Sequence, residues 1–500
     1  MVSASSCCWL WTVAAFVFGV PKCLAIMVAP LASPQPSISP HVLKLRRESV
    51  PVRRKGEIVS HKTSYSGVIS IGNPVRQEFR VVFDTGSGHV VLPSVECKSE
   101  TCLMHRRYNM TASSTAVAIN VDGFPVPEGE LTDQVTIGYG TGQVTGEFVK
   151  DEVCIGSARA LEQSIAEGSQ PPCSTVNVVT AVEMSKKPFQ KFGFDGILGL
   201  GLSSLALSKH FSFFDRLSSD KKAASPHFGV FLTDGEDGDE PEIAFGGHNP
   251  KRLLGPLSWS PVIKPELGYW LLEIVAVRVD GKALDACADG SCRGIMDTGT
   301  SHLGIPTPHD ATLGKLLLQD AANVKDCRHV QAPTLEFEFR NFNMTLYPED
   351  YMRPLPLMEG IQIGSKNGVN LEDPGNEEPK VTKVETELVT PSQEGSKKEC
   401  RPRLMPVSLP APLGPNLFIL GEPVMHRYYT IFDWAGPQIG FGLARKSRYD
   451  DASKMKEKGQ MLREDVSRLL PTLPSANSIV TSGIQDEVIL LQVSLSLKRK

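Results

Sequence analysis

One short motif occurs twice in this chain, and the repeat decides the fold. Residues 82–88 read VFDTGSG, and residues 295–301 read IMDTGTS. In each copy an aspartate follows an apolar, strand-like run and precedes a glycine turn. Two carboxylates held in contact cannot both ionise, so their titrations separate. The repeat therefore predicts that Asp84 and Asp297 form one pair, with one base and one acid, suited to water attack on an amide.

A second repeated element divides the chain into two related halves. Residues 194–199 read FDGILG after the first motif, and residues 418–421 read FILG after the second. Short apolar runs with glycine punctuation dominate the rest, which predicts an all-β fold. We expect strands at 67–71, 79–83, 134–139, 143–148, 228–232, 242–245, 270–279, 334–339 and 429–432. We expect helices only at 205–217 and 310–321.

Length and composition describe a soluble chain with two lobes. Its 500 residues exceed what one hydrophobic core usually supports. The 41% hydrophobic and 22% charged residues are ordinary, and a net charge of −4 argues against a nucleic-acid binder. We expect an N-terminal lobe at 64–255 and a C-terminal lobe at 256–446, interrupted at about 359–399 by a disordered insertion poor in aromatic residues. Residues 447–500 read as a polar tail with one amphipathic helix at 454–470.

The N-terminus is typical of a secretory signal. Residues 8–20 are apolar but short for a membrane span, and Ala25 suits cleavage, so we expect a signal peptide at 1–25. The region before the apolar run lacks Lys and Arg, which leaves a retained signal anchor as the alternative. The apolar run at 488–497 is too short to span a bilayer. Residues 26–63 begin as a Pro- and Ser-rich linker and become strongly basic from residue 44.

The cysteines favour disulfides. Eight remain outside the signal, an even number, and none forms a Cys-x-x-Cys pair that would favour zinc. Their local spacing suggests four pairs, although eight cysteines allow 105 pairings. The suggested pairs are Cys97–Cys102, Cys154–Cys173, Cys287–Cys292 and Cys327–Cys400.

Six motifs in fixed order resemble the pepsin-like aspartic proteases, the group of pepsin, cathepsin D, renin and the plasmepsins. The resemblance covers about residues 65–443 without the insertion. The motifs are DTGS at 84–87, YGTG at 139–142, FDGILG at 194–199, GYW at 268–270, DTGTS at 297–301 and YYTIFD at 428–433. The sequence at 88–91 and at 203–217 is similar to that of plasmepsin-like proteases of apicomplexan parasites. The resemblance implies a bilobal all-β fold with the active cleft between the lobes.

The resemblance also implies a role for each motif residue. Asp84 and Asp297 would hold the attacking water. Thr85 and Thr298 would bridge the two loops, and Ser87 and Thr300 would bond the outer carboxylate oxygens. The glycines Gly86 and Gly299 complete the two loops. Three of the four cysteine pairs sit where the family has disulfides, and Cys154–Cys173 looks additional.

The resemblance places a hairpin flap over the cleft. Tyr139 matches the aromatic residue at its tip, followed by Gly140 and Thr141, and its glycines would let it close. Most relatives have a Trp seven residues after the first catalytic Asp, where its ring N–H bonds the flap Tyr. Here that position is Val91, which has no donor, so the flap must be held differently or move more. His89 lies near the motif, but no serine elbow accompanies it, and we interpret it as structural.

These features together predict an aspartic endopeptidase that works at acidic pH without cofactor or metal. The substrate would be an extended peptide of about eight residues bound like an added strand. A catalytically silent peptide-binding pseudoprotease is the alternative. The basic segment before Ser64 would be an inhibitory propeptide. We expect a monomer in the secretory pathway, secreted or in an acidic vesicle, with sequons at Asn109 and Asn343.

Overall fold

The computed structural model describes residues 40–54, 57–236, 238–358, 397–446 and 489–499. The expected signal, the expected helix at 454–470 and nearly all of the expected insertion lie outside this part of the chain. Strands dominate the described residues, as the sequence predicts, and the bilobal all-β fold class is confirmed. No helix among the described residues has both the length and the apolar character needed to cross a membrane.

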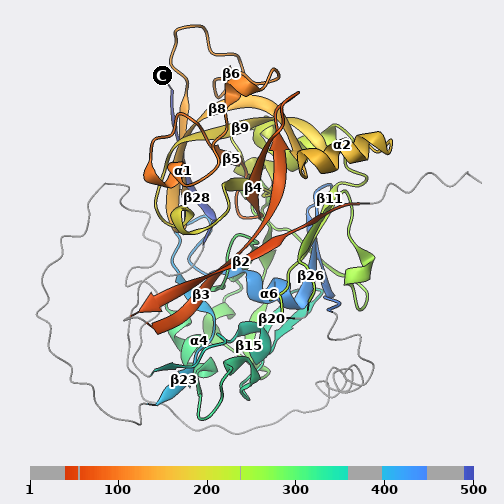
Figure 1. Cartoon of the computed structure of the whole chain (residues 1–500). Helices are drawn as coiled ribbons and strands as arrows, with labels where there is room; N and C mark the ends of the chain where they lie inside the picture. The colour runs from red at the N-terminus through yellow and green to blue at the C-terminus, as the bar shows by residue number, and fades with distance from the viewer. Residues whose placement is uncertain (1–39, 55–56, 237, 359–396, 447–488, 500) are drawn as a thin grey trace, which may run out of the picture. The chain divides into compact units, whose positions relative to one another are not determined.

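One large sheet carries the first motif. Its strands run in the order β2, β3, β4, β10, β5, β9, β8, β7, β28, with β6 added on β8. Their bounds are β2 (Arg46–Arg54), β3 (Glu57–Ile71), β4 (Gln77–Asp84), β10 (Gly196–Gly199), β5 (Val90–Pro93), β9 (Cys173–Met184), β8 (Gly142–Ile155), β7 (Gln134–Tyr139), β28 (Gln492–Lys498) and β6 (Val117–Ile119). The C-terminal strand β28, blue in Figure 1, therefore belongs to a sheet of N-terminal strands.

The second motif lies in a five-stranded sheet of the order β14, β17, β25, β18, β24. The strands are β14 (Leu271–Glu273), β17 (Arg293–Met296), β25 (Leu417–Leu420), β18 (Leu303–Pro306) and β24 (Leu404–Val407). In the first sheet β4 is parallel to β10, β10 antiparallel to β5, and β5 parallel to β9. The series β17, β25, β18, β24 repeats these directions. The two repeated elements of the sequence, at 194–199 and 418–421, thus form β10 and β25, each beside an aspartate strand.

A six-stranded sheet joins the two halves in the order β1, β12, β11, β26, β27, β13. Its strands are β1 (His41–Lys44), β12 (Glu242–Phe245), β11 (His227–Phe231), β26 (Tyr428–Asp433), β27 (Gln438–Leu443) and β13 (Ser258–Pro261). Two smaller sheets hold β16 (Lys282–Ala283), β15 (Ala276–Val279), β20 (Leu335–Glu338) and β21 (Asn343–Leu346), and β19 (Gln319–Asp320), β23 (Lys398–Cys400) and β22 (Leu357–Met358). Aromatic side chains fill the core behind the six-stranded sheet, where the rings of Phe228 and Phe432 stack at 4.9 Å.

The helices are short, and one expectation about them is wrong. They are α1 (Glu100–Leu103), α2 (Ala158–Ala166), α3 (Phe213–Ser219), α4 (His309–Leu317), α5 (Pro348–Tyr351) and α6 (Glu422–Arg427). The predicted helix at 205–217 is broken into short turns before α3, and Ser208 is fully extended there (φ −161°, ψ 170°). Residues 205–206 pack tightly on Gly88. A Cβ atom added to Gly88 would lie 2.7 Å from the backbone nitrogen of Ala206. This tertiary contact outweighs local helix propensity.

Four disulfides join the cysteine pairs that spacing suggests: Cys97–Cys102, Cys154–Cys173, Cys287–Cys292 and Cys327–Cys400. The last one lies beside a boundary that the sequence places wrongly. Lys398 and Glu399, expected in the disordered insertion, belong to β23, which pairs with both β19 and β22. Pairing to two neighbours and the adjacent disulfide at Cys400 order these residues.

Candidate active site

The two motif loops hold each other through a symmetric set of hydrogen bonds. The Thr85 N–H donates to Thr298 Oγ1 at 2.9 Å, and the Thr298 N–H donates to Thr85 Oγ1 at 3.0 Å. Each hydroxyl then donates to a backbone carbonyl of the opposite half, Thr85 to Met296 at 2.9 Å and Thr298 to Phe83 at 2.6 Å. The threonines therefore fix the ends of β4 and β17 against each other, as the resemblance implies.

This bridging brings Asp84 and Asp297 together, and both are fully buried. Each accepts a hydrogen bond from the glycine of its own loop, Gly86 N–H to Asp84 at 2.9 Å and Gly299 N–H to Asp297 at 2.8 Å. Each glycine also faces the opposite acid, because a Cβ on Gly86 would lie 2.7 Å from Asp297 Oδ1 and one on Gly299 would overlap Asp84 Oδ1. Only glycine leaves room for the two carboxylates to meet.

The two carboxyl groups have unequal surroundings. Burial, followed by the charge of Asp297, raises the pKa of Asp84 well above its ordinary value. Burial also raises the pKa of Asp297, but bonds from Thr300, Asp84 and Gly299 oppose the rise. The Thr300 hydroxyl donates to Asp297 Oδ2 at 2.5 Å. The arrangement favours one shared proton, held on Asp84 and donated towards an ionised Asp297.

Ser87 and Thr300 occupy matching positions but do not act equally. The Ser87 hydroxyl opposes the rise in the pKa of Asp84, yet it falls short of hydrogen-bond geometry, and neither Ser87 Oγ nor Asp84 Oδ2 has a hydrogen-bond partner in the described part of the chain. A hydroxyl displaced from hydrogen-bond geometry stabilises a carboxylate less than the Thr300 hydroxyl does at 2.5 Å. The asymmetry again makes Asp297 the better anion.

A buried polar network supports the second loop from behind. The Glu422 N–H donates to the Thr300 carbonyl at 2.9 Å, and Arg403 bonds both Glu422 and the Ser301 carbonyl. Burial alone would raise the pKa of Glu422, but Arg403 and His426 outweigh it and hold the pKa well below its usual range. An ionised Glu422 therefore anchors the start of α6 beside the loop of Asp297.

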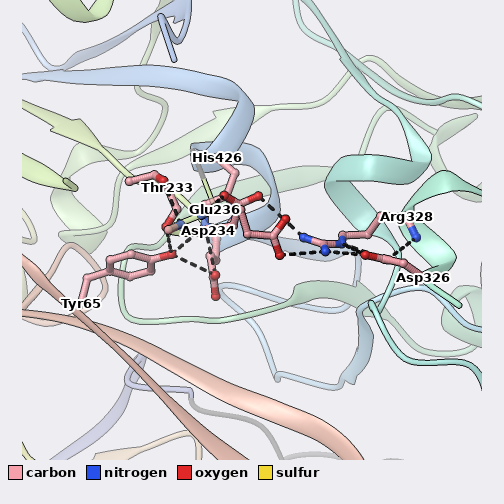
Figure 2. Close-up of polar contacts among 9 residues, drawn as sticks. Tyr65, Thr233, Asp234, Glu236, Asp326, Arg328 and His426 are labelled. Carbon is pink, nitrogen blue, oxygen red and sulfur yellow. Dashed lines mark hydrogen bonds and ion pairs between the residues drawn. The ribbon is translucent and has the colours of Figure 1, made fainter. Parts of the chain in front are cut away.

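The same network reaches the first half of the chain through Tyr65 of β3. Figure 2 shows its hydroxyl close to Thr233 and to the α6 residue His426. The hydroxyl lies 2.7 Å from His426 Nε2, 3.1 Å from Glu422 Oε1 and 2.9 Å from the Thr233 carbonyl. The contacts in Figure 2 continue to Arg328, which binds Glu236 at 2.8 Å. Both halves are thus tied together through a network that also contacts the second motif loop.

The flap residue Tyr139 ends β7, and β7 pairs with β8 in a hairpin. Tyr139 is buried, its ring lies 6.0 Å from that of Phe189, and Val91 is in the same apolar cluster. Its hydroxyl has no hydrogen-bond partner among the described residues, as expected with Val91 in place of a donor. The flap is held differently, because the Gly140 N–H donates to the Leu491 carbonyl at 3.0 Å and the Thr141 hydroxyl to the Ile489 carbonyl at 3.1 Å.

The sequence interpretation missed this C-terminal contribution. From sequence, the apolar run at 488–497 is interpreted only as too short for a membrane span within a polar tail, yet Ile489, Leu490 and Leu491 are buried between the flap and the dyad loops. Gln492 contacts His89, which therefore does more than pack in a core. The alternation of apolar residues with Ser494 and Ser496 was the available signal, because a period of two indicates a strand.

Comparison with known proteins agrees with this geometry. Residues 64–357 match the family described as eukaryotic aspartyl protease. The chain belongs to this family. It is 30% identical over 385 residues to cathepsin E of Mus musculus, a match covering 76% of this chain and 80% of the relative. It is also 30% identical over 382 residues to cathepsin E of Aquarana catesbeiana (75% and 78% covered), and 29% identical over 389 residues to pepsin II-1 of Oryctolagus cuniculus (76% and 81% covered).

Family membership makes this chain an aspartic-type endopeptidase, so the predicted fold and reaction class are confirmed. The narrower likeness to plasmepsin-like proteases stays a prediction. So do the two glycosylation sites. Asn343 is exposed at the start of β21, whereas Asn109 is half-buried and its Oδ1 accepts from the backbone and hydroxyl of Thr111.

Proposed function

We propose that Asp84 and Asp297 hydrolyse peptide bonds by activating water, with Asp297 as the base and Asp84 as the acid. Asp297 takes a proton from the water, which attacks the carbonyl carbon, and Asp84 gives its proton to the departing nitrogen. The observation that carries this assignment is the unequal support of the pair: Thr300 and Gly299 bond Asp297, while Asp84 Oδ2 has no partner among the described residues. The pseudoprotease alternative has no such observation in its favour.

The substrate we propose is an extended peptide with apolar side chains next to the cut. Its backbone would lie between the motif loops and the flap, where Gly140 and Thr141 offer an N–H and a hydroxyl. The working form has one proton on the dyad, and that proton is lost as the pH rises through the upper apparent pKa. Activity should therefore be greatest at acidic pH. An acidic compartment of the secretory pathway and a monomeric enzyme fit this chemistry.

Asparagine at either acid tests the assignment. Asp84→Asn and Asp297→Asn should each abolish hydrolysis of an apolar reporter peptide with a loss of several kcal/mol in transition-state stabilisation, while folding is kept. Asp285→Asn, at an exposed aspartate outside both motif loops, is the matched control and should leave kcat/KM unchanged. Substantial turnover by either dyad variant would refute the shared-proton mechanism.

We also propose that the basic segment before Ser64 restrains the enzyme as a propeptide. Lys44 of β1 bonds Glu242 at 3.0 Å, and β1 pairs along its length with β12, so acid would weaken the ion pair by protonating Glu242. A chain beginning at Ser64 should cleave the reporter faster than the full chain. Equal rates at acidic pH would contradict the idea.

A further inference from the structure

The C-terminal segment Ile489–Lys498 lies across the dyad in the manner of a bound peptide. The Leu490 N–H donates to the Gly299 carbonyl at 3.3 Å, and the Gln492 N–H donates to the Gly86 carbonyl at 2.9 Å. These two glycines follow Asp297 and Asp84 in their loops. The segment is therefore anchored once on each side of the dyad, and the peptide bond between Leu490 and Leu491 lies between the anchors.

The flap closes on the same residues from the opposite side. Its donors engage the carbonyls of Ile489 and Leu491, and the Tyr269 hydroxyl donates to the Gln492 carbonyl at 2.6 Å. The Leu490 carbonyl, in contrast, accepts no hydrogen bond from any described residue. A Cβ atom added to Gly299 would overlap Asp84 and would also lie 2.9 Å from the Cβ of Leu490. Among the four residues from Ile489 to Gln492, the carbonyl that no described residue engages is thus the one beside the carboxyl pair.

The side chains of the segment pack against hydrophobic residues of both halves. Leu490 packs in the cluster of Tyr139, Phe189 and Val91, whereas Ile489 and Leu491 pack in a cluster on the second half. Beyond Gln492 the segment continues as β28, antiparallel to β7, and covers the outer edge of the flap strand. An extended strand added to an exposed sheet edge is a general mode of peptide binding.

Gln492 is held by a set of polar groups matched to its amide. His89 Nε2 accepts from the Leu207 N–H at 3.0 Å, so its Nδ1 carries the hydrogen and donates to Gln492 Oε1 at 3.3 Å. The Gly88 N–H also donates to Oε1, and Gln492 Nε2 donates to the Leu205 carbonyl at 3.1 Å. Both ends of the amide are engaged and buried, so an apolar side chain in its place would leave these surrounding polar groups unpaired.

We propose that the C-terminal segment is the enzyme's own first substrate, which fills the cleft and is cut at the Leu490–Leu491 bond. This inference rests on the dyad function proposed above. One solvent water adds to the Leu490 carbonyl carbon and gives a proton to Asp297, and Asp84 protonates the Leu491 nitrogen as the C–N bond breaks. The products are a chain ending in the Leu490 carboxyl group and a free peptide of residues 491–500. Until then, covalent attachment keeps the segment at an effective concentration on the order of millimolar.

The first test follows the full chain by intact mass after transfer from neutral to acidic buffer. We expect loss of residues 491–500, and a lag in reporter hydrolysis whose length does not depend on enzyme concentration. Leu490→Asn should slow self-cleavage by about tenfold or more, because Leu490 is fully buried among apolar residues. The matched control Leu495→Asn, at a side chain that is 37% exposed, should stay within about twofold.

Several results of this test would overturn the inference. They are an intact C-terminus in a chain that hydrolyses the reporter, a cut at another bond of the segment, or a lag that shortens with enzyme concentration. If neither the segment nor the reporter is hydrolysed, the dyad function fails instead, and occupancy is then decided by a measurement that needs no turnover.

That measurement compares amide hydrogen exchange in Asp84→Asn chains ending at residue 500 or at residue 488. In the full chain the Gly140 N–H is bonded to the Leu491 carbonyl. Removing the segment should speed exchange of the Gly140 amide hydrogen by about tenfold or more. The covalent link holds the segment at an effective concentration on the order of millimolar, which keeps even a weakly binding segment in the cleft. Added peptide of residues 489–498 should restore protection. Equal exchange in both chains would refute occupancy of the cleft.

Discussion

Removing the hydroxyl of Thr300 should move the acid side of the activity profile. That hydroxyl donates to Asp297 Oδ2 at 2.5 Å, and Asp297 is fully buried, so solvent does not screen the bond. A hydrogen bond to a charged group contributes about 1.5–3 kcal/mol. Losing the bond should destabilise the ionised form of Asp297 by about that much, so Thr300→Ala should raise the pKa of the Asp297 carboxyl further.

The direction of the shift in the pH profile depends on which protonation state of Asp297 is active. Asp297 must be ionised to accept a proton from water, so the acid limb of kcat/KM reports its protonation in the free enzyme. A raised pKa shifts this limb to higher pH and narrows the range of activity. The assay is a pH profile of kcat/KM on an apolar reporter peptide, measured on a chain ending at residue 488 so that the C-terminal segment does not compete.

Two variants serve as controls for this prediction. Thr300→Ser keeps the hydroxyl and should preserve the acid limb. Ser87→Ala changes the matching position of the first loop, where Ser87 Oγ makes no hydrogen bond to a described residue, and should move the profile less. An acid limb that stays in place in Thr300→Ala, or a shift as large in Ser87→Ala, would refute the assignment of Asp297 as the base.

Three further predictions concern stability and the flap. The pKa of Asp84 is raised in the fold, so the stability that its proton contributes is present at low pH and is lost as the pH rises through the raised pKa. The Tm of the wild-type chain should therefore fall over this pH range, and Asp84→Asn should make the fall smaller. Parallel curves of Tm against pH for the two chains would contradict this prediction. Val91→Trp should destabilise the lobe by about 1–3 kcal/mol because Val91 is 1% exposed, and an unchanged denaturation midpoint would show spare room. Tyr139→Phe should change kcat/KM by less than about twofold because its hydroxyl has no described partner, whereas Tyr139→Ala should lower it; equal kinetics in the folded alanine variant would remove the flap assignment.

Where the sequence predicted correctly, the signal lay in local pattern or in a repeat. The Asp-Thr-Gly copies each end a strand, and glycine is the one residue that leaves space between the acids, so motif and geometry are inseparable at Asp84 and Asp297. The disulfides follow the local spacing of the cysteines. The broken helix at 205–217 shows the limit of such reasoning, because a contact with Gly88, distant in sequence, overrides the local apolar pattern.

The sequence by itself determined the family, the carboxyl pair and the two related halves, because these depend on residues that must stand in fixed order near one another. Only the tertiary structure decided how the pair is polarised and what fills the cleft. Thr300 and Ser87 look equivalent in their motifs, but the hydrogen-bond distances separate them. The pairing of β28 with β7 joins strands far apart in the chain, and the meeting of Gln492 with His89 has no local signature. Such contacts depend on complementary edges and pockets that exist only after the chain has folded.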